Sequence, residues 1–225
     1  MSLEFANRAE AGRALAQRLT ETPLEAPIVV LALPRGGVPV AAEVARALGA
    51  DLDLILVRKI GAPFQPELAV AAVVDGDPPE IVVDDETSAL CGVDRHYIDA
   101  QAQSELREIE RRRRVYLGSR TPVDVAGATV IVVDDGIATG TTMRAALRAL
   151  RNRRPKRLVL AVPVAPPETL ASLRSEVDEV VCLSRPSPFH AIGLHYTDFH
   201  QVSDDEVLAA LNSAKRPQPG LKPPT

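Results

Sequence analysis

Cysteine and long apolar runs are scarce in this sequence. It contains two cysteines, Cys91 and Cys182, and neither lies in a paired motif. This favours two reduced thiols in a cytosolic protein over a disulfide framework. The first residues lack the apolar core of a signal peptide, and no stretch is long enough to span a membrane. We therefore expect a cytoplasmic protein that makes no membrane contact.

Aromatic residues and excess positive charge are also lacking. The chain has three Tyr, four Phe and no Trp, and its formal net charge is −4. A negative net charge argues against a surface that coats nucleic acid. The 46% hydrophobic and 25% charged residues are ordinary globular values. A chain of 225 residues is long enough for one large α/β domain.

Short apolar runs alternate with helical patterns along the chain. We expect strands at 28–33, 52–57, 69–74, 81–83, 130–133, 158–162 and 178–183, and helices at 3–20, 40–48, 94–117, 142–152, 167–174 and 203–212. This alternation predicts an α/β fold with a doubly wound, mainly parallel sheet. The predicted domain covers 1–212, with a helical insertion or cap at 84–120, and the Pro-rich tail 213–225 is expected to be disordered.

The most informative stretch is 129–142. Val130 to Val133 is a β-branched run that suits a strand buried on both faces. Asp134 and Asp135 end this run, a Gly- and Thr-rich loop follows, and good helix formers begin at Met143. We therefore expect a strand, an acidic tip, a loop and a helix, in that order.

This order of elements suits a phosphorylated sugar. Backbone N–H groups that open a helix form an anion site, and Thr hydroxyls can add hydrogen bonds to phosphate oxygens. The residues expected to bind substrate here are Gly136, Ile137, Ala138, Thr139, Gly140, Thr141 and Thr142. The two carboxylates accept only, so they suit ribose hydroxyls or a hydrated Mg²⁺. The Lys of a Walker A loop is absent, which argues against an ATPase. The alternative is a tight turn with Thr caps, which would leave two acids at a buried strand end without compensation.

Two further loops follow predicted strands and belong at the same edge of a parallel sheet. The loop Pro34-Arg35-Gly36-Gly37 combines a guanidinium fork, suited to diphosphate, with two glycines that permit unusual backbone angles. Arg58 and Lys59 enter a loop at 59–68 that could close as a lid. The alternatives are a turn with an exposed Arg and a solvated basic pair.

A third loop, 185–199, follows the last predicted strand. It holds three of the seven aromatic residues, Phe189, Tyr196 and Phe199, and two of the four histidines, His190 and His195. Aromatic rings can stack on a flat base, and Phe189 is the candidate for that contact. The alternative is packing of the C-terminal segment on the sheet. A histidine-based metal site lacks supporting carboxylate spacing. The run Arg111–Arg114 predicts a solvated helix face paired with Glu108 and Glu110, with a nucleic-acid contact as the alternative.

The stretch Val-Ile-Val-Val-Asp-Asp-Gly-Ile-Ala-Thr-Gly-Thr-Thr resembles the phosphoribosyl-pyrophosphate motif of type I phosphoribosyltransferases. Over residues 3–212 the chain is similar to a widespread set of predicted phosphoribosyltransferases with Pro-Arg-Gly-Gly and Val-Arg-Lys-x-Gly-Ala-Pro. The resemblance implies Mg²⁺ held by Asp134 and Asp135 through water, and catalytic roles for these two residues with Arg35 and Lys59. It also implies a diphosphate loop that often carries a cis peptide, a lid like that of adenine and orotate enzymes, and a base-contacting loop at 185–199.

The resemblance implies transfer of ribose 5-phosphate from phosphoribosyl pyrophosphate to a nucleobase-like acceptor, with release of diphosphate. The position of Ala138 usually carries Asp in 6-oxopurine enzymes, which argues against hypoxanthine and guanine. One alternative is a non-catalytic regulator that binds phosphoribosyl pyrophosphate or a nucleotide. Another is a receiver-type domain, which would leave the Pro34–Gly37 loop unexplained. The identity of the acceptor and the oligomeric state, a homodimer included, stay open.

Overall fold

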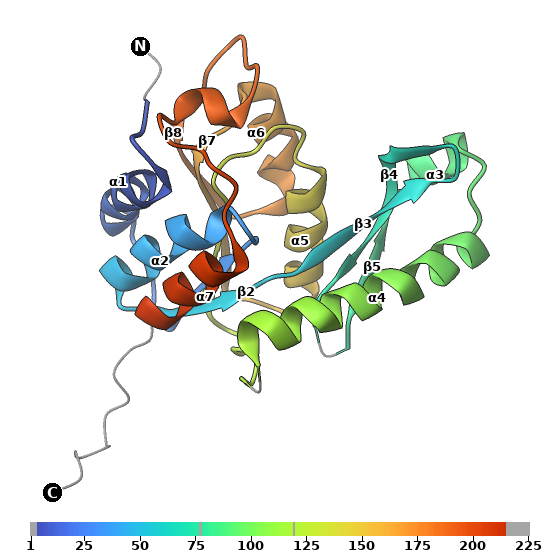
Figure 1. Cartoon of the computed structure of the whole chain (residues 1–225), viewed down its shortest axis with the longest axis horizontal. Coiled ribbons are helices and arrows are strands. Elements are labelled where there is room, and N and C mark those ends of the chain that lie inside the picture. Colours follow the sequence, from blue (N-terminus) through green and yellow to red (C-terminus); the bar gives the residue numbers. More distant parts are fainter. Residues whose placement is uncertain (1–3, 77, 119, 215–225) are drawn as a thin grey trace, which may run out of the picture.

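A five-stranded parallel sheet forms the body of the molecule. The computed structural model describes residues 4–76, 78–118 and 120–214. The strands, in the order in which they lie side by side, are β2 (Asp51–Leu54), β1 (Ile28–Ala32), β6 (Thr129–Val133), β7 (Arg157–Val164) and β8 (Glu179–Ser184). The predicted α/β fold class with a mainly parallel sheet is thereby confirmed (Figure 1). The predicted tail from 215 lies outside the described residues.

Helices cover both faces of this sheet, which is why its central strands β1, β6 and β7 are largely apolar runs. Alternate strand residues, such as Val30 and Ile131, share one core with the helices α1 (Arg8–Thr20), α2 (Gly37–Leu48) and α7 (Asp204–Ser213). The residues between them, such as Val130 and Leu158, share the other core with α5 (Thr141–Asn152) and α6 (Pro167–Leu173). Two short 3-10 helices, Arg174–Glu176 and Ile192–His195, complete the described elements of the body.

An arm extends from the body between β2 and β6 (Figure 1). It consists of an antiparallel sheet of β3 (Val57–Ala62), β4 (Gln65–Val74) and β5 (Glu80–Val83), followed by α3 (Asp85–Leu90) and α4 (Arg95–Leu117). The helix predicted at 94–117 matches α4, whose N-terminus is capped by Asp94 through a 2.8 Å hydrogen bond from the N–H of Tyr97. The arm is a second sheet rather than a continuation of the parallel one.

The loop predicted at 59–68 is wrong, because this segment is a β-hairpin. Gly61 and Pro66, read as loop signals, lie where the pairing of β3 and β4 shifts register. A Cβ atom on Gly61 would stand 2.2 Å from the carbonyl oxygen of Pro66, so only glycine fits at this irregular point. Glycine and proline punctuate a bulged strand as readily as a loop, and local sequence does not separate the two.

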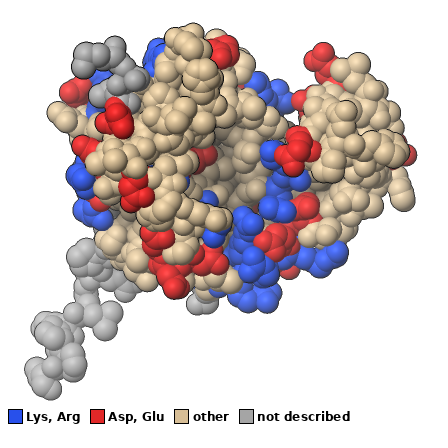
Figure 2. Space-filling view, turned by 45° about the horizontal axis from the view of Figure 1, so that its top comes forward, with Lys and Arg blue, Asp and Glu red and all other residues tan. Residues whose placement is uncertain are grey.

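Three arginines of the predicted run, Arg111, Arg112 and Arg113, are paired within the protein. Arg111 and Arg112 both donate to Glu108 at 2.8 Å, and these hydrogen bonds lower the pKa of Glu108 to about 2. Arg113 donates to both oxygens of Asp75, each at 2.8 Å. Figure 2 shows acidic and basic side chains next to each other, in keeping with this pairing. In the described part of the chain, no helix is long and apolar enough to cross a membrane.

Candidate functional site

The acidic tip lies where β6 ends. Asp135 is buried, with 8% of its surface exposed, and Asp134 is partly exposed. Asp134 Oδ1 accepts the backbone N–H of Asp135 at 2.8 Å. Burial raises the pKa of Asp134 well above its ordinary value, and the neighbouring charge of Asp135 raises it further. Burial and the neighbouring charge thus disfavour the ionised form of Asp134, and a hydrogen-bond donor or a cation bound at the tip would favour it.

The segment after the acidic tip is held in shape by β7 and α6. The N–H of Ile137 donates to the carbonyl of Val164 at 3.0 Å, and the Thr169 hydroxyl donates to the carbonyl of Ala138 at 2.7 Å. Gly140 has φ of 79°, a left-handed conformation that favours glycine. The backbone is thus fixed from both sides before the helix begins.

The N-terminus of α5 is open to a ligand. Among the described residues, no side chain caps this helix at Gly140. Thr139 and Thr141 are exposed, and Thr142 is partly exposed. Free N–H groups at a helix N-terminus carry a partial positive charge and attract anions. This geometry supports the predicted anion cradle at 136–142.

The Pro34–Gly37 loop lies directly against the acidic tip. Strands β1 and β6 pair in parallel up to Ala32 and Val133, so the loops that follow them are neighbours. A Cβ atom on Gly36 would stand 2.0 Å from Asp135 Oδ2, and one on Gly37 would stand 2.8 Å from the Val133 carbonyl oxygen. Only glycines allow this approach.

Arg35 is the second residue of the same loop, and its side chain points towards the C-terminal helix α7. The Pro34–Arg35 peptide is cis, as the family resemblance implies. Arg35 Nη1 lies 3.7 Å from Oδ1 of Asp204, the first residue of α7. Asp204 also accepts the hydroxyl of Tyr116 at 2.6 Å, which joins α7 to the arm. The structure thus places Arg35 beside the contact between body and arm.

The basic pair predicted at the lid lies on β3 of the arm. Neighbouring strand residues point to opposite faces of the sheet, so Arg58 and Lys59 diverge. Arg58 donates to Glu105 of α4 at 2.7 Å, which engages its guanidinium within the arm. Lys59 is exposed and pairs with Ala72, which packs in the same core as α5. Lys59 is therefore on the face that turns towards the helix of the anion cradle, and Figure 2 shows a hollow between body and arm.

The aromatic segment 185–199 packs mainly on the N-terminal residues. Tyr196 is buried, its ring lies 5.6 Å from that of Phe5, and Phe199 lies 5.0 Å from Tyr196. Phe189 is partly exposed and stacks on the buried His195 with ring centroids 5.9 Å apart. Tyr196 and Phe199 therefore pack within the protein, as the alternative interpretation of this segment predicted. The ring of Phe189 is partly exposed to solvent, so it is accessible to a ligand.

Two residues near the acidic tip escaped sequence reasoning. Arg8, at the start of α1, donates from Nε to Asp135 Oδ2 at 2.7 Å. Ile192 lies over the cradle, since a Cβ atom on Gly136 would stand 2.6 Å from its Cγ2. Arg8 looked like one of several polar residues on an amphipathic helix, and Ile192 like an ordinary apolar residue of a loop. No motif in the neighbouring sequence marks Arg8 or Ile192 as a residue of the site.

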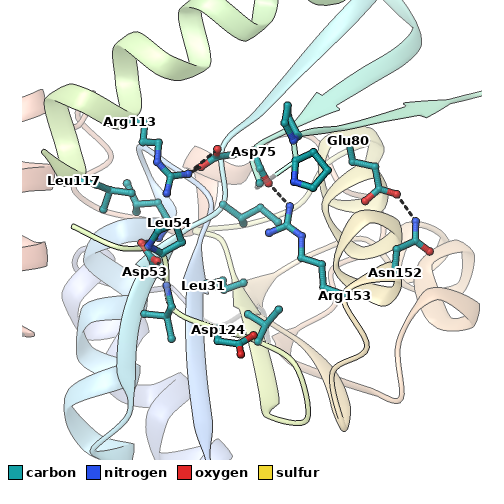
Figure 3. Close-up of a pocket in the computed structure, with 17 residues that line it drawn as sticks. Leu31, Asp53, Leu54, Asp75, Glu80, Arg113, Leu117, Asp124, Asn152 and Arg153 are labelled. Carbon is teal, nitrogen blue, oxygen red and sulfur yellow. Dashed lines mark hydrogen bonds and ion pairs between the residues drawn. The ribbon is translucent and has the colours of Figure 1, made fainter. Parts of the chain in front are cut away.

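A separate cavity lies away from the acidic tip. It measures about 480 Å³ and lies where the arm joins the body, between β2, α4 and the end of α5 (Figure 3). None of the residues predicted to bind substrate lines it. Charged and polar side chains that line it have partners: Arg113 binds the Asp75 carboxylate, Arg153 donates to the Asp75 carbonyl, and Asn152 donates to Glu80. We interpret this cavity as part of the junction rather than as the site of the 129–142 motif.

Comparisons with known proteins identify the family of the chain. The family model described as "Phosphoribosyl transferase domain" matches residues 3–198. A Mycobacterium tuberculosis protein, named provisionally as a phosphoribosyl transferase, is 45% identical over 212 residues, which are 94% of this chain and 47% of that protein. The chain thus spans about half the length of this curated relative. The "Bifunctional protein PyrR 1" of Lactiplantibacillus plantarum is 42% identical over 72 residues, covering 32% of this chain and 34% of that protein.

A solved structure extends the comparison to the whole fold. The crystal structure of the Thermus thermophilus protein TT1426 is 45% identical, with a TM-score of 0.79, over 93% of this chain and 98% of that one. The chain belongs to the phosphoribosyl transferase domain family.

Proposed function

We propose that this domain transfers ribose 5-phosphate from phosphoribosyl pyrophosphate to a nucleobase-like acceptor and releases diphosphate. The bond between C1 of the ribose and the diphosphate oxygen breaks, and the acceptor nitrogen forms the new bond to C1. The observation that carries this proposal is the contact of the Gly36–Gly37 backbone with Asp134 and Asp135, next to the uncapped N-terminus of α5. It brings an anion cradle, a diphosphate loop and two carboxylates together at one edge of the sheet.

The 5′-phosphate would bind at residues 136–142. The free N–H groups of the first turn of α5 offer hydrogen-bond donors and the positive end of the helix dipole. Hydroxyls of Thr139, Thr141 and Thr142 add further donors. Hydrogen bonds to a charged group contribute about 1.5–3 kcal/mol each, so a few such contacts account for tight binding of a sugar phosphate.

The diphosphate would bind between the Pro34–Gly37 loop and the arm. The backbone of Gly36 and Gly37, together with the Arg35 guanidinium, faces this group in our proposal. Lys59 would neutralise it from the arm, as supported by its exposure on the face that turns towards α5. Negative charge develops on the leaving diphosphate in the transition state. Preorganised cations and N–H groups that stabilise this charge would therefore supply most of the catalysis.

The acidic tip fits a magnesium ion. Mg²⁺ prefers oxygen ligands and is commonly held by one or two carboxylates, waters and substrate phosphates. Asp134 is partly exposed, and a cation beside it would offset the burial and the charge of Asp135 that raise its pKa. Asp134 and Asp135 would hold the ion, mostly through water, and it would supply charge neutralisation at the diphosphate. The ribose hydroxyls would share the same two acceptors.

The acceptor would lie between the cradle and segment 185–199. Ala138 offers no carboxylate to take a ring proton, so hypoxanthine and guanine should be poor acceptors unless histidine helps. His195 is buried behind Phe189, whereas His190 is exposed. Efficient turnover of hypoxanthine by a His190→Ala, His195→Ala double variant would contradict this part of the proposal. Product formation with a panel of bases tests it.

Titration calorimetry of two ligands tests the proposal as a whole. Phosphoribosyl pyrophosphate with Mg²⁺ should bind, and Arg35→Ala or Lys59→Ala should weaken it by about 1.5–3 kcal/mol. A nucleoside 5′-monophosphate, which lacks the diphosphate, should lose much less. Arg95→Ala, at an exposed arginine paired with Asp99 on α4, is the matched control and should change neither affinity.

Equal losses for both ligands would mean that Arg35 and Lys59 act structurally. Failure of the unmodified chain to bind phosphoribosyl pyrophosphate would overturn the proposal. Binding without transfer to any base would instead indicate the regulatory alternative, in which the same site senses the ligand. The enzyme and regulator hypotheses share the same binding site and differ only in whether phosphoribosyl transfer occurs.

A further inference from the structure

Asp135, the second acid of the tip, forms an ion pair with Arg8 near the N-terminus of the chain. Arg8 Nε lies 2.7 Å from Asp135 Oδ2, and the side chains of the two residues are only 9% and 11% exposed. The residues are 127 positions apart in the sequence. A buried pair of this kind is costly to build and far more costly to break, because a lone buried charge would remain.

Arg8 is fixed by further contacts besides the ion pair. Its Nη1 donates to the carbonyl of His200 at 2.9 Å, and its guanidinium carbon lies 4.0 Å above the ring of Phe199. Helix α1 is itself close to α2, since a Cβ atom on Gly12 would stand 2.7 Å from the carbonyl oxygen of Val40. Helix α2 begins at Gly37, so Arg8 is placed relative to the diphosphate loop.

Asp135 is fixed by contacts on its other sides. Its carbonyl accepts the hydroxyl of the buried Tyr196 at 2.6 Å. Its Oδ2, the oxygen that Arg8 binds, lies against Gly36 so closely that a methyl group there would collide. Because Arg8 occupies Oδ2, Oδ1 is the oxygen left for substrate. The ion pair therefore determines the position of a carboxylate beneath the diphosphate loop.

We propose that Arg8 is a positioning residue for the ribose and diphosphate part of the site, acting through the carboxylate of Asp135. This inference rests on the proposed function and goes beyond it, because Arg8 lies on the N-terminal helix, outside all the motifs. Without Arg8, the Asp135 carboxylate is free to rotate and the Gly36–Gly37 backbone loses its support. The 136–142 cradle, held by β7 and α6, keeps its shape.

The experiment compares two probes on folded variants. Arg8→Gln should weaken binding of phosphoribosyl pyrophosphate with Mg²⁺ about 10- to 100-fold, the range seen when the partner of a ligating group is removed. Binding of inorganic phosphate, followed by chemical-shift titration, needs only the cradle and should change little. Arg8→Lys should restore part of the affinity. Arg13→Gln, on the same helix at a side chain 61% exposed, is the matched control and should change nothing.

A double-mutant cycle separates positioning from a general structural role. If Arg8 acts through Asp135, adding Arg8→Gln to Asp135→Asn should weaken substrate binding little beyond Asp135→Asn alone. Losses that multiply to within about twofold would overturn the inference, since independent sites behave that way. If Arg8→Gln alone does not fold, Arg8→Lys and the double variant carry the test, because neither leaves a lone buried carboxylate.

The two proposals fail differently. If the unmodified chain binds phosphoribosyl pyrophosphate and Arg8→Gln binds it equally well, the role of Arg8 is refuted and the proposed function stands. If the unmodified chain does not bind it at all, the proposed function falls and this inference falls with it. A melting temperature for each variant shows that the comparison is between folded proteins.

Discussion

Replacing Gly36 by alanine should disturb the site through lack of space rather than through backbone strain. The backbone of Gly36 has φ of −61° and ψ of −35°, which alanine adopts easily. Its Cβ atom, however, would stand 2.0 Å from Asp135 Oδ2 and 2.6 Å from Cγ. Ordinary contact begins at 3.4 Å, so the loop or the carboxylate must move by about 1.4 Å.

The size of the effect depends on what gives way. If the loop lifts, the cost is that of overpacking, about 1–3 kcal/mol. If the carboxylate retreats, it must leave Arg8, which binds it at 2.7 Å, and breaking a buried pair costs about 3–5 kcal/mol. A protein of this size loses about 2–4 °C in melting temperature per kcal/mol. We therefore expect a drop of several degrees and a marked loss of affinity for phosphoribosyl pyrophosphate.

Thermal and urea unfolding, with and without ligand, measure this prediction. Gly127→Ala is the control: Gly127 has φ of 68° and nothing within 4 Å of a Cβ atom. It should cost about 1–2 kcal/mol from strain alone and leave affinity unchanged. In an Asp135→Ala background, Gly36→Ala should cost clearly less, because the colliding oxygens are gone. A Gly36→Ala protein with unchanged melting temperature and affinity would refute the reasoning.

Three further substitutions test other parts of the structure. Asp134→Asn should raise the melting temperature near pH 7 while abolishing substrate binding. Burial, aided by the charge of Asp135, raises the pKa of Asp134 in the folded protein. Ionisation of Asp134 therefore lowers stability as the pH rises from the unfolded pKa of about 3.9 to the folded pKa, and asparagine avoids this loss. A variant as stable as the parent at pH 7 would contradict this. Tyr116→Phe removes the 2.6 Å hydrogen bond to Asp204 and should lower the free energy of unfolding by about 0.5–1.5 kcal/mol in urea titrations. Phe64→Ser, at a tip residue 96% exposed, should change that free energy by less than about 0.5 kcal/mol, and a larger loss would show that the tip is packed.

Sequence alone was enough for the features that neighbouring residues define. The run 130–133, the acids that end it and the helix formers after Met143 are contiguous, and the structure has β6, the acidic tip and α5 at these positions. The helix at 94–117 was predictable for the same reason, since its apolar residues recur at helical spacing and Asp94 stands at its start, where an N-cap residue is common. Local propensity and periodicity decide such elements, so their existence and order follow from the chain.

The arm shows where local information ends. Gly61 and Pro66 carry the same signals in a bulged hairpin as in a loop, and only the pairing of β3 with β4 distinguishes the two. Likewise, the rings of segment 185–199 suit a base or a core equally well. The packing of Tyr196 on Phe5 depends on the N-terminal residues lying beside residues 195–198 in the fold.

The local environment of the acidic tip was decided by the tertiary structure alone. The sequence determined that two carboxylates end a buried strand, which is a costly arrangement. It did not determine what compensates them, because the compensating charge comes from Arg8, 127 positions away. An ion pair between distant residues depends on how α1, β6 and the C-terminal segment pack together, and no pattern within any one of them specifies that contact.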